Sequence, residues 1–171
     1  MLERIWSGWR ATYVGSAPSR VDPDAADGSV FTRLLTSGEP DEATHILHRG
    51  SEVFAILNIH PYTTGHLLVL PYREVADLAE LSASETHELW ATVTDAVATV
   101  RAAYEPDGLN VGVNLGQVAG GSVPTHLHVH VVPRWAGDSN FMSAIANTQT
   151  LPESLDDSAA RLRGAWRSST S

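Results

Sequence analysis

The chain has 171 residues, of which 43% are hydrophobic, a length and composition that suit one domain with a substantial core. Its 20 acidic and 11 basic side chains give a formal charge of -9, which argues against a general nucleic-acid groove because binding a phosphate backbone requires a basic face. The absence of cysteine excludes disulfides, thiolate zinc sites and a cysteine nucleophile.

The N-terminal region is typical of an extension rather than of a targeting signal. It lacks the uninterrupted apolar core of a signal peptide, and no apolar run reaches membrane-spanning length, so we expect a soluble, cytoplasmic protein without membrane contact. The apolar spacing over 1–13 suits a short helix. We expect Trp6 and Trp9 to dock onto the core or a second subunit, the alternative being that they stack on an adenine.

Short apolar runs dominate the middle of the chain. Phe31, Leu34 and Leu35 predict one or two helical turns that end at Ser37-Gly38. Runs typical of strands follow at 44–48, 53–59, 66–70 and 110–114. A short polar segment between the first two suits a hairpin, and a turn-rich loop carrying polar side chains precedes the third.

Two further segments carry a helical pattern. Ser82 and Glu85 resemble a capping box, and apolar residues recur after them at helical spacing until Glu105. Near the C-terminus, one helical face is marked by Leu155, Ala159, Leu162 and Trp166. Strands outnumber helices and short connections join several of them, so the predicted class is α+β, with a mainly antiparallel sheet, one long helix and a C-terminal helix.

His126, His128 and His130 form the most informative pattern in the sequence. They alternate with three aliphatic residues, a two-residue period that suits a strand with one buried face. Neighbouring rings on such a face start about 6.6 Å apart, close enough to converge on one phosphate or one metal ion. Pro133 lacks an amide proton and is expected at the strand's end or at a sheet edge.

The loop that leads into these histidines is rich in small residues. Asn114 ends the preceding strand, and Gly120, Gly121 and Ser122 offer backbone amides and little side-chain bulk where a ligand approaches.

Chemistry alone leaves three interpretations of the histidine pattern. Neutral imidazoles bind zinc, and an open fourth position would make that zinc catalytic, but no acidic residue lies in or just before the stretch to fix the tautomers. In the second interpretation, His128 attacks phosphorus while its neighbours hold the anionic oxygens. In the third, the histidines are core residues bonded to backbone carbonyls.

The same residues resemble the signature of the histidine-triad (HIT) family. His126-Leu-His-Val-His-Val-Val132 matches its alternation of histidines and apolar residues, and Phe54-Ala-Ile-Leu-Asn58 with Gly65-His66-Leu-Leu-Val-Leu-Pro71 is similar to its nucleotide-binding half. The resemblance implies a HIT-like fold with a five-stranded sheet, pairing of two chains as a homodimer, and chemistry on nucleoside phosphates. It also divides the chain into an extension at 1–29, the HIT domain at 30–142 and a helical extension at 143–171.

Carried over by position, the resemblance assigns a role to each polar residue. His128 would be the nucleophile that takes the nucleoside monophosphoryl group, with His126 and His130 positioning and stabilising the phosphate. His66 would be a fourth histidine of the site, and Asn58 would bond the ribose hydroxyls. Many relatives carry zinc-binding cysteines near the start of the domain, whereas Val30-Phe-Thr-Arg33 has none, so no protein-bound metal is expected. Mg²⁺ would arrive with the polyphosphate substrate.

Ser122 stands where hydrolytic relatives commonly have glutamine. Together with Gly120, Gly121 and Asn114, it resembles the subgroup of bacterial diadenosine tetraphosphate phosphorylases, in which inorganic phosphate is the second acceptor. The expected enzyme therefore converts diadenosine tetraphosphate plus phosphate to ADP plus ATP through a nucleotidyl-histidine intermediate. The alternatives are a phosphoramidase or a water-using dinucleoside polyphosphate hydrolase of the same family, and a non-catalytic nucleotide-binding sensor.

Overall fold

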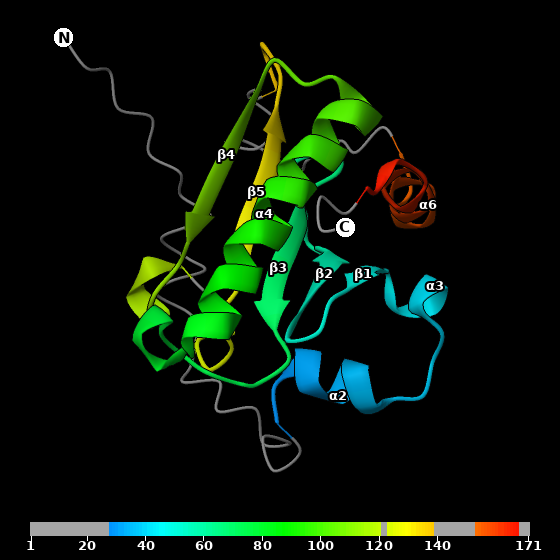
Figure 1. The fold of residues 1–171 in the computed structure, drawn as a ribbon. Coiled ribbons are helices and arrows are strands. Elements are labelled where there is room, and N and C mark those ends of the chain that lie inside the picture. The colour runs from blue at the N-terminus through cyan, green and yellow to red at the C-terminus, as the bar shows by residue number, and fades with distance from the viewer. Residues whose placement is uncertain (1–27, 121–122, 139–152, 168–171) are drawn as a thin grey trace, which may run out of the picture.

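A five-stranded antiparallel sheet organises the chain (Figure 1), for which a computed structural model describes residues 28–120, 123–138 and 153–167. The strands are β1 (Ile46–Arg49), β2 (Val53–Leu57), β3 (Leu67–Pro71), β4 (Gly108–Val113) and β5 (Val129–Arg134). Their order across the sheet is β1-β2-β3-β5-β4, and all four neighbouring pairs are antiparallel. The predicted α+β class and antiparallel sheet are therefore confirmed.

Helices cover both faces of this sheet. They are α2 (Val30–Thr36), α3 (Asp41–Thr44), η2 (Leu78–Glu80), α4 (Ala83–Tyr104), η3 (Gln117–Ala119) and α6 (Leu155–Ala165). The predicted capping box begins α4, because the Ser82 hydroxyl accepts from the Glu85 amide while the Glu85 carboxylate accepts from the Ser82 amide. Within the described ranges, no helix combines the length and apolarity needed to cross a membrane.

The two faces of the sheet carry different side chains. On one face, the larger apolar cluster packs under α4 and α6, which lie in front of and beside the sheet in Figure 1. On the other face, a smaller cluster packs against α2; its buried members are Ile46, Phe54, Ile56, Leu68 and Leu70. His130 pairs with Leu68 across β3 and β5, and directly opposed residues share a face, so the imidazole of His130 lies on the α2 side.

The predicted strands at 44–48, 53–59, 66–70 and 110–114 are present, each with an end shifted by one or two residues. Two differences change the local structure, at the start of β1 and at the start of β5. Thr44 ends α3, and His45 follows it in the left-handed conformation with φ 58, so β1 begins only at Ile46. Regular pairing in β5 begins at Val129, which leaves His126 and His128 in the segment that leads into the strand. The three histidines therefore do not occupy one continuous strand face.

Pro133 lies inside β5, where it pairs with Leu109 of β4. Its carbonyl accepts a hydrogen bond of 2.8 Å from the Thr63 hydroxyl on the opposite side. The carbonyl and amide positions of one strand residue point to the same side, and here that side is beyond the last β3–β5 pair, Leu67 with Val131. The missing N–H of Pro133 therefore costs no hydrogen bond between strands. β5 is a central strand, but on this side β3 does not extend as far as Pro133, so the residue has the open neighbour position expected for a proline.

Candidate active site

Three imidazoles and two amides meet on the α2 side of the sheet. The ring centroids of His128 and His130 are 4.9 Å apart, and those of His130 and His66 are 5.2 Å apart. His66 lies at the start of β3, in contact with Asn58, and His130 lies within 3.3 Å of the Asn114 side chain. The structure thus brings together five of the residues that the sequence singled out.

His128 is held in one tautomer by the backbone. Its Nδ1 lies 2.8 Å from the carbonyl oxygen of His126, and a carbonyl only accepts, so Nδ1 carries the proton. In the neutral ring, the lone pair then belongs to Nε2, for which no hydrogen-bond partner is found among the described residues. The side chain is almost fully buried, so this nitrogen is presented in a fixed direction.

A second chain of hydrogen bonds fixes His66 and His130. The backbone N–H of Tyr62 donates to Nδ1 of His66 at 3.0 Å, so the neutral His66 ring carries its proton on Nε2. That proton is donated across 3.0 Å to Nδ1 of His130. Nε2 of His130 therefore carries a proton of its own, and this N–H points out of the chain of rings.

The side chain of Asn114 follows His130 in this series of hydrogen bonds. Its Nδ2 lies 3.3 Å from Nε2 of His130. Two donors would meet there if the ring is neutral, so turning the amide by 180° places its oxygen as the acceptor. A bound anionic oxygen near this point would compete with the amide for the His130 proton.

Burial keeps these rings uncharged. Desolvation lowers the pKa of His66 to about 3, with further lowering by His130 and His128. Desolvation, followed by the neighbouring His128, lowers the pKa of His130 to about 4. Desolvation also lowers the pKa of His128, although its bond to the His126 carbonyl opposes the shift. At neutral pH the site therefore offers an unprotonated nucleophilic nitrogen and neutral N–H donors.

The ring of His126 bonds groups other than the three clustered rings. Its side chain is fully buried, Nδ1 is 2.7 Å from the Ser29 hydroxyl, and Nε2 is 2.9 Å from the carbonyl of Pro71. Both ring nitrogens therefore have partners in this structure, and the predicted role of His126 in positioning and stabilising the phosphate stays a prediction. In the described segments, no group of three or more histidine, cysteine, aspartate or glutamate side chains is arranged to hold a metal ion.

Of the glycines and the serine predicted to contact the ligand, only Gly120 is among the residues that the structure describes. Gly120 ends η3 with φ 95, a left-handed conformation that suits glycine. Gly121, Ser122 and the N-terminal tryptophans are not among the described residues, so their predicted roles stay predictions.

Sequence reasoning missed three residues around the rings. Ser29 bonds His126, Phe31 lies edge-on to His126 and 5.8 Å from His128, and Tyr62 stacks on His130 with ring centroids 6.0 Å apart. A signal for the first was present, because Ser29 precedes an apolar helical run with Thr32 three places later, which is typical of a helix N-cap.

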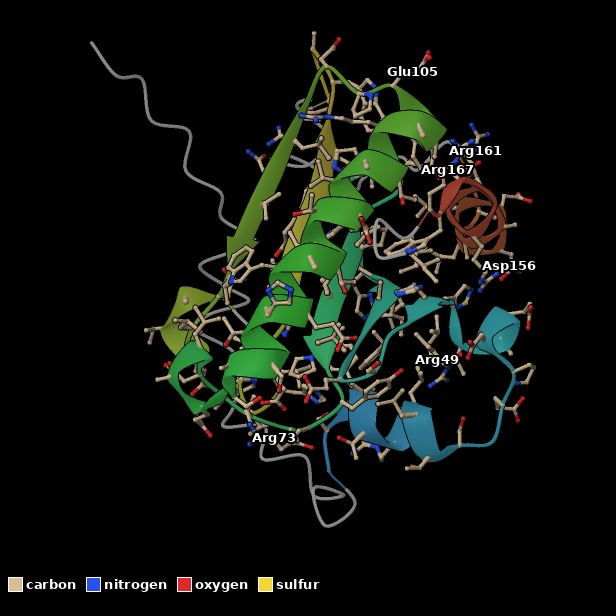
Figure 2. All side chains as sticks on the ribbon, in the orientation of Figure 1. Arg49, Arg73, Glu105, Asp156, Arg161 and Arg167 are labelled. Atoms are coloured by element: carbon tan, nitrogen blue, oxygen red, sulfur yellow. The ribbon has the colours of Figure 1, made fainter. Side chains whose placement is uncertain are left out.

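Two arginines share this face of the sheet by their strand positions, and each is bound by a carboxylate. Arg49, labelled beside α3 in Figure 2, donates to Asp41 through Nε at 3.0 Å and Nη2 at 2.8 Å. Arg134 donates to Asp138 at 2.6 and 2.8 Å, which lowers the pKa of that carboxyl to about 2. Both guanidinium groups are therefore paired with carboxylates in this structure.

Comparison with known proteins agrees with this geometry. The chain is 41% identical over 167 residues to a Mycobacterium tuberculosis protein named AP-4-A phosphorylase, an alignment that covers 96% of this chain and 85% of the relative. It is 35% identical over 96 residues to a Schizosaccharomyces pombe protein named asymmetrical bis(5'-nucleosyl)-tetraphosphatase, covering 52% of each. Among solved structures, a Zn-bound histidine triad family protein from Mycobacterium smegmatis gives a TM-score of 0.65 at 28% identity, covering 81% of this chain and 92% of that one.

A family model described as the HIT domain matches residues 39–137, which is more than half of the 171 residues. The matched range contains β1 to β5, α4 and the three clustered rings. Together with the mycobacterial relative, this match shows that the chain belongs to the HIT domain family.

Proposed function

We propose that the chain is a nucleotidyl transferase that cleaves dinucleoside polyphosphates through a covalent intermediate on His128. The observation that carries this proposal is the fixed tautomer of His128, in which the His126 carbonyl takes the Nδ1 proton and leaves the Nε2 lone pair available. A buried, neutral imidazole with a directed lone pair is an activated nucleophile that needs no separate general base.

In the first half-reaction, Nε2 of His128 attacks the phosphorus of a terminal nucleotide. A phosphorus–nitrogen bond forms and the bond from that phosphorus to the bridging oxygen breaks, so the rest of the substrate leaves with the oxygen. For diadenosine tetraphosphate, the leaving group is ATP and the enzyme keeps an adenylyl group. We expect the N–H on Nε2 of His130 to hold a phosphoryl oxygen as negative charge develops, and the hydrogen bond from His66 to Nδ1 supports this protonation of the ring.

In the second half-reaction, an oxygen of inorganic phosphate attacks the adenylyl phosphorus. The phosphorus–nitrogen bond breaks, ADP is released and His128 returns to its neutral state. Support for phosphate as the acceptor comes from the relative named AP-4-A phosphorylase, whose alignment covers 96% of the chain. The predicted roles of Gly120, Gly121, Ser122 and Asn114 in binding that phosphate, and of Asn58 in binding the ribose, belong to this proposal.

Water is the competing acceptor. The relative named bis(5'-nucleosyl)-tetraphosphatase favours this second candidate, although its alignment covers only 52% of the chain. Product analysis with diadenosine tetraphosphate separates the two. Phosphorolysis predicts ADP plus ATP only when phosphate is present, whereas AMP plus ATP in phosphate-free buffer would assign the hydrolase.

Neutral rings do not balance the charge of a polyphosphate. Since Arg49 and Arg134 are bound to Asp41 and Asp138, we propose that Mg²⁺ enters bound to the substrate, held by phosphate oxygens and water. Turnover is then expected to follow the concentration of the Mg²⁺–nucleotide complex. Equal rates in the presence of excess chelator would contradict this expectation.

The homodimer implied by family resemblance has a candidate surface. β4 is an edge strand of the sheet (Figure 1), and no described strand pairs with its outer side. Val111 on β4 and Trp90 on α4 are 43% and 44% exposed. An open edge with exposed apolar residues favours pairing with a second copy of the chain. Sedimentation of wild type and Val111→Lys tests this proposal, with a dimer expected for the first and a monomer for the second.

A further inference from the structure

A cluster of polar side chains, buried at Ser29 and His126 and exposed at Glu74, is connected to His128 through the His126 carbonyl. It joins the N-terminus of α2 to the turn that carries His126, although these segments are 97 residues apart in sequence. The cluster is made of Ser29, Thr32, Glu74 and His126. Ser29 is the N-cap of α2 and is buried, and His126 is fully buried.

Each proton in the cluster has a single assignment. Nε2 of His126 faces the Pro71 carbonyl at 2.9 Å and therefore carries the ring proton, so Nδ1 is the acceptor. The Ser29 hydroxyl must then donate to Nδ1 across 2.7 Å. The Thr32 hydroxyl donates instead to the Glu74 carboxylate at 2.8 Å, and the same oxygen of Glu74 accepts the backbone N–H of Ser29 at 2.7 Å.

The approach of Glu74 to the start of α2 leaves no spare room. Gly28 has φ 85, and a Cβ there would lie 3.0 Å from a Glu74 carboxylate oxygen and from the Thr32 side chain. The positive φ favours glycine, and a side chain at this position would crowd both the carboxylate and Thr32. The local sequence Gly28-Ser29 is therefore matched to the cluster that it forms.

Two contacts connect this cluster to His128. The carbonyl of His126 accepts the Nδ1 proton of His128, so the orientation of that peptide sets which nitrogen of His128 is nucleophilic. Phe31, in the first turn of α2, lies 5.5 Å from the His126 ring and 5.8 Å from the His128 ring. The Ser29 side chain thus fixes the ring of His126 from one side and begins the helix that places Phe31 against both rings.

We propose that Ser29, supported by Glu74, is a positioning residue that acts through His126 to orient the nucleophilic ring of His128. This proposal rests on the function proposed above. Loss of the Ser29 hydroxyl frees one nitrogen of a buried imidazole and loosens the peptide that directs His128. Substrate affinity depends on other contacts, so the effect is expected in kcat rather than in KM.

The test compares Ser29→Ala and Ser29→Thr with a matched N-cap control. Ser154 caps α6 as Ser29 caps α2, each hydroxyl accepting the amide three residues on. Among the described residues, the Ser154 hydroxyl bonds Asp157 and no histidine. Ser29→Ala is expected to lower kcat about tenfold with KM within about twofold. Ser29→Thr keeps a hydroxyl and is expected to restore most of the rate, and Ser154→Ala is expected to keep wild-type kcat.

A second readout does not depend on turnover. In ¹⁵N-histidine NMR of the wild type, His126 is expected to be protonated on Nε2 and hydrogen-bonded at unprotonated Nδ1. In Ser29→Ala, the Nδ1 resonance should shift and the Nδ1–H signal of His128 should broaden, with neither change in Ser154→Ala. A wild-type His126 protonated on Nδ1, or a Ser29→Ala enzyme with unchanged kcat, would overturn the proposal. Expected spectra with no turnover in any variant would instead contradict the proposed function.

Discussion

The two faces of the sheet are built by the same strands but bury different kinds of side chain. The face under α4 and α6 buries aliphatic residues such as Leu67, Val69 and Val129, which are fully buried members of the large apolar cluster. The opposite face buries imidazoles beside a smaller apolar cluster under α2. Strand alternation separates these two environments by a single residue step.

The two faces therefore make different contributions: one mainly stabilises the fold, and the other holds the rings of the candidate active site. The face under α4 and α6 mainly removes apolar area from water, with the half-buried His48 stacked on Trp166 at its β1 end. Each ring on the other face needs a specified tautomer and a specified partner. Those partners are backbone groups for His128 and His66, namely the His126 carbonyl and the Tyr62 amide. Rigid backbone fixes the rings because the aliphatic face holds the strands in place.

The largest predicted effect is the loss of activity in His128→Ala. Removing the nucleophile abolishes the intermediate, so kcat is expected to fall by at least about 10³-fold. Thermal unfolding should change less than in a variant of the aliphatic face, because only one partly polar ring is lost. Residual turnover within about tenfold of wild type would assign the nucleophile elsewhere.

A core substitution is expected to give the opposite result. Leu89 on α4 is fully buried in the large cluster, so Leu89→Ala should lower the free energy of unfolding by about 2–5 kcal/mol. Measured by urea denaturation, this loss should exceed that of His128→Ala, while kcat per folded molecule stays within about twofold of wild type. A folded Leu89→Ala protein with lost activity would contradict the claim that this face contributes to stability and not to the reaction.

A smaller effect is expected from pH. The pKa of His66 is lowered to about 3 and that of His130 to about 4, from a usual value of 6.5. Between pH 6.5 and these values, the unfolded chain binds protons that the folded chain does not, so stability falls as pH falls. The slope is at most about 1.4 kcal/mol per pH unit for each ring. His66→Asn should reduce the slope in urea titrations between pH 6 and 4; an unchanged slope would contradict burial of a neutral ring.

The sequence pattern predicted those helices and strands that are determined by neighbouring residues in the sequence. The capping box of Ser82 and Glu85, the apolar stripe of α4 and the runs that form β2 and β3 depend on neighbouring residues, and all were confirmed. The α3 turn was missed because a strand-like run at 44–48 hides the left-handed His45, which has φ 58. No local signal distinguishes the two, since tertiary packing decides between them.

The site was predictable as a set of residues but not as a network. Alternation identified the three histidines, yet it implied that all three point the same way. The bond from Ser29 to His126 spans 97 residues and depends on how α2 docks against the sheet. Such contacts between distant segments give His126 its partners Ser29 and Pro71, and they bring His66 within 3.0 Å of His130.

Intact-mass spectrometry of the protein quenched during turnover of diadenosine tetraphosphate tests the central claim most directly. The mechanism predicts a species heavier than the free chain by one adenylyl group, attached at His128, which disappears on addition of phosphate and never forms in His128→Ala. Turnover without any mass increase, or an adenylyl group mapped to another residue, would contradict it.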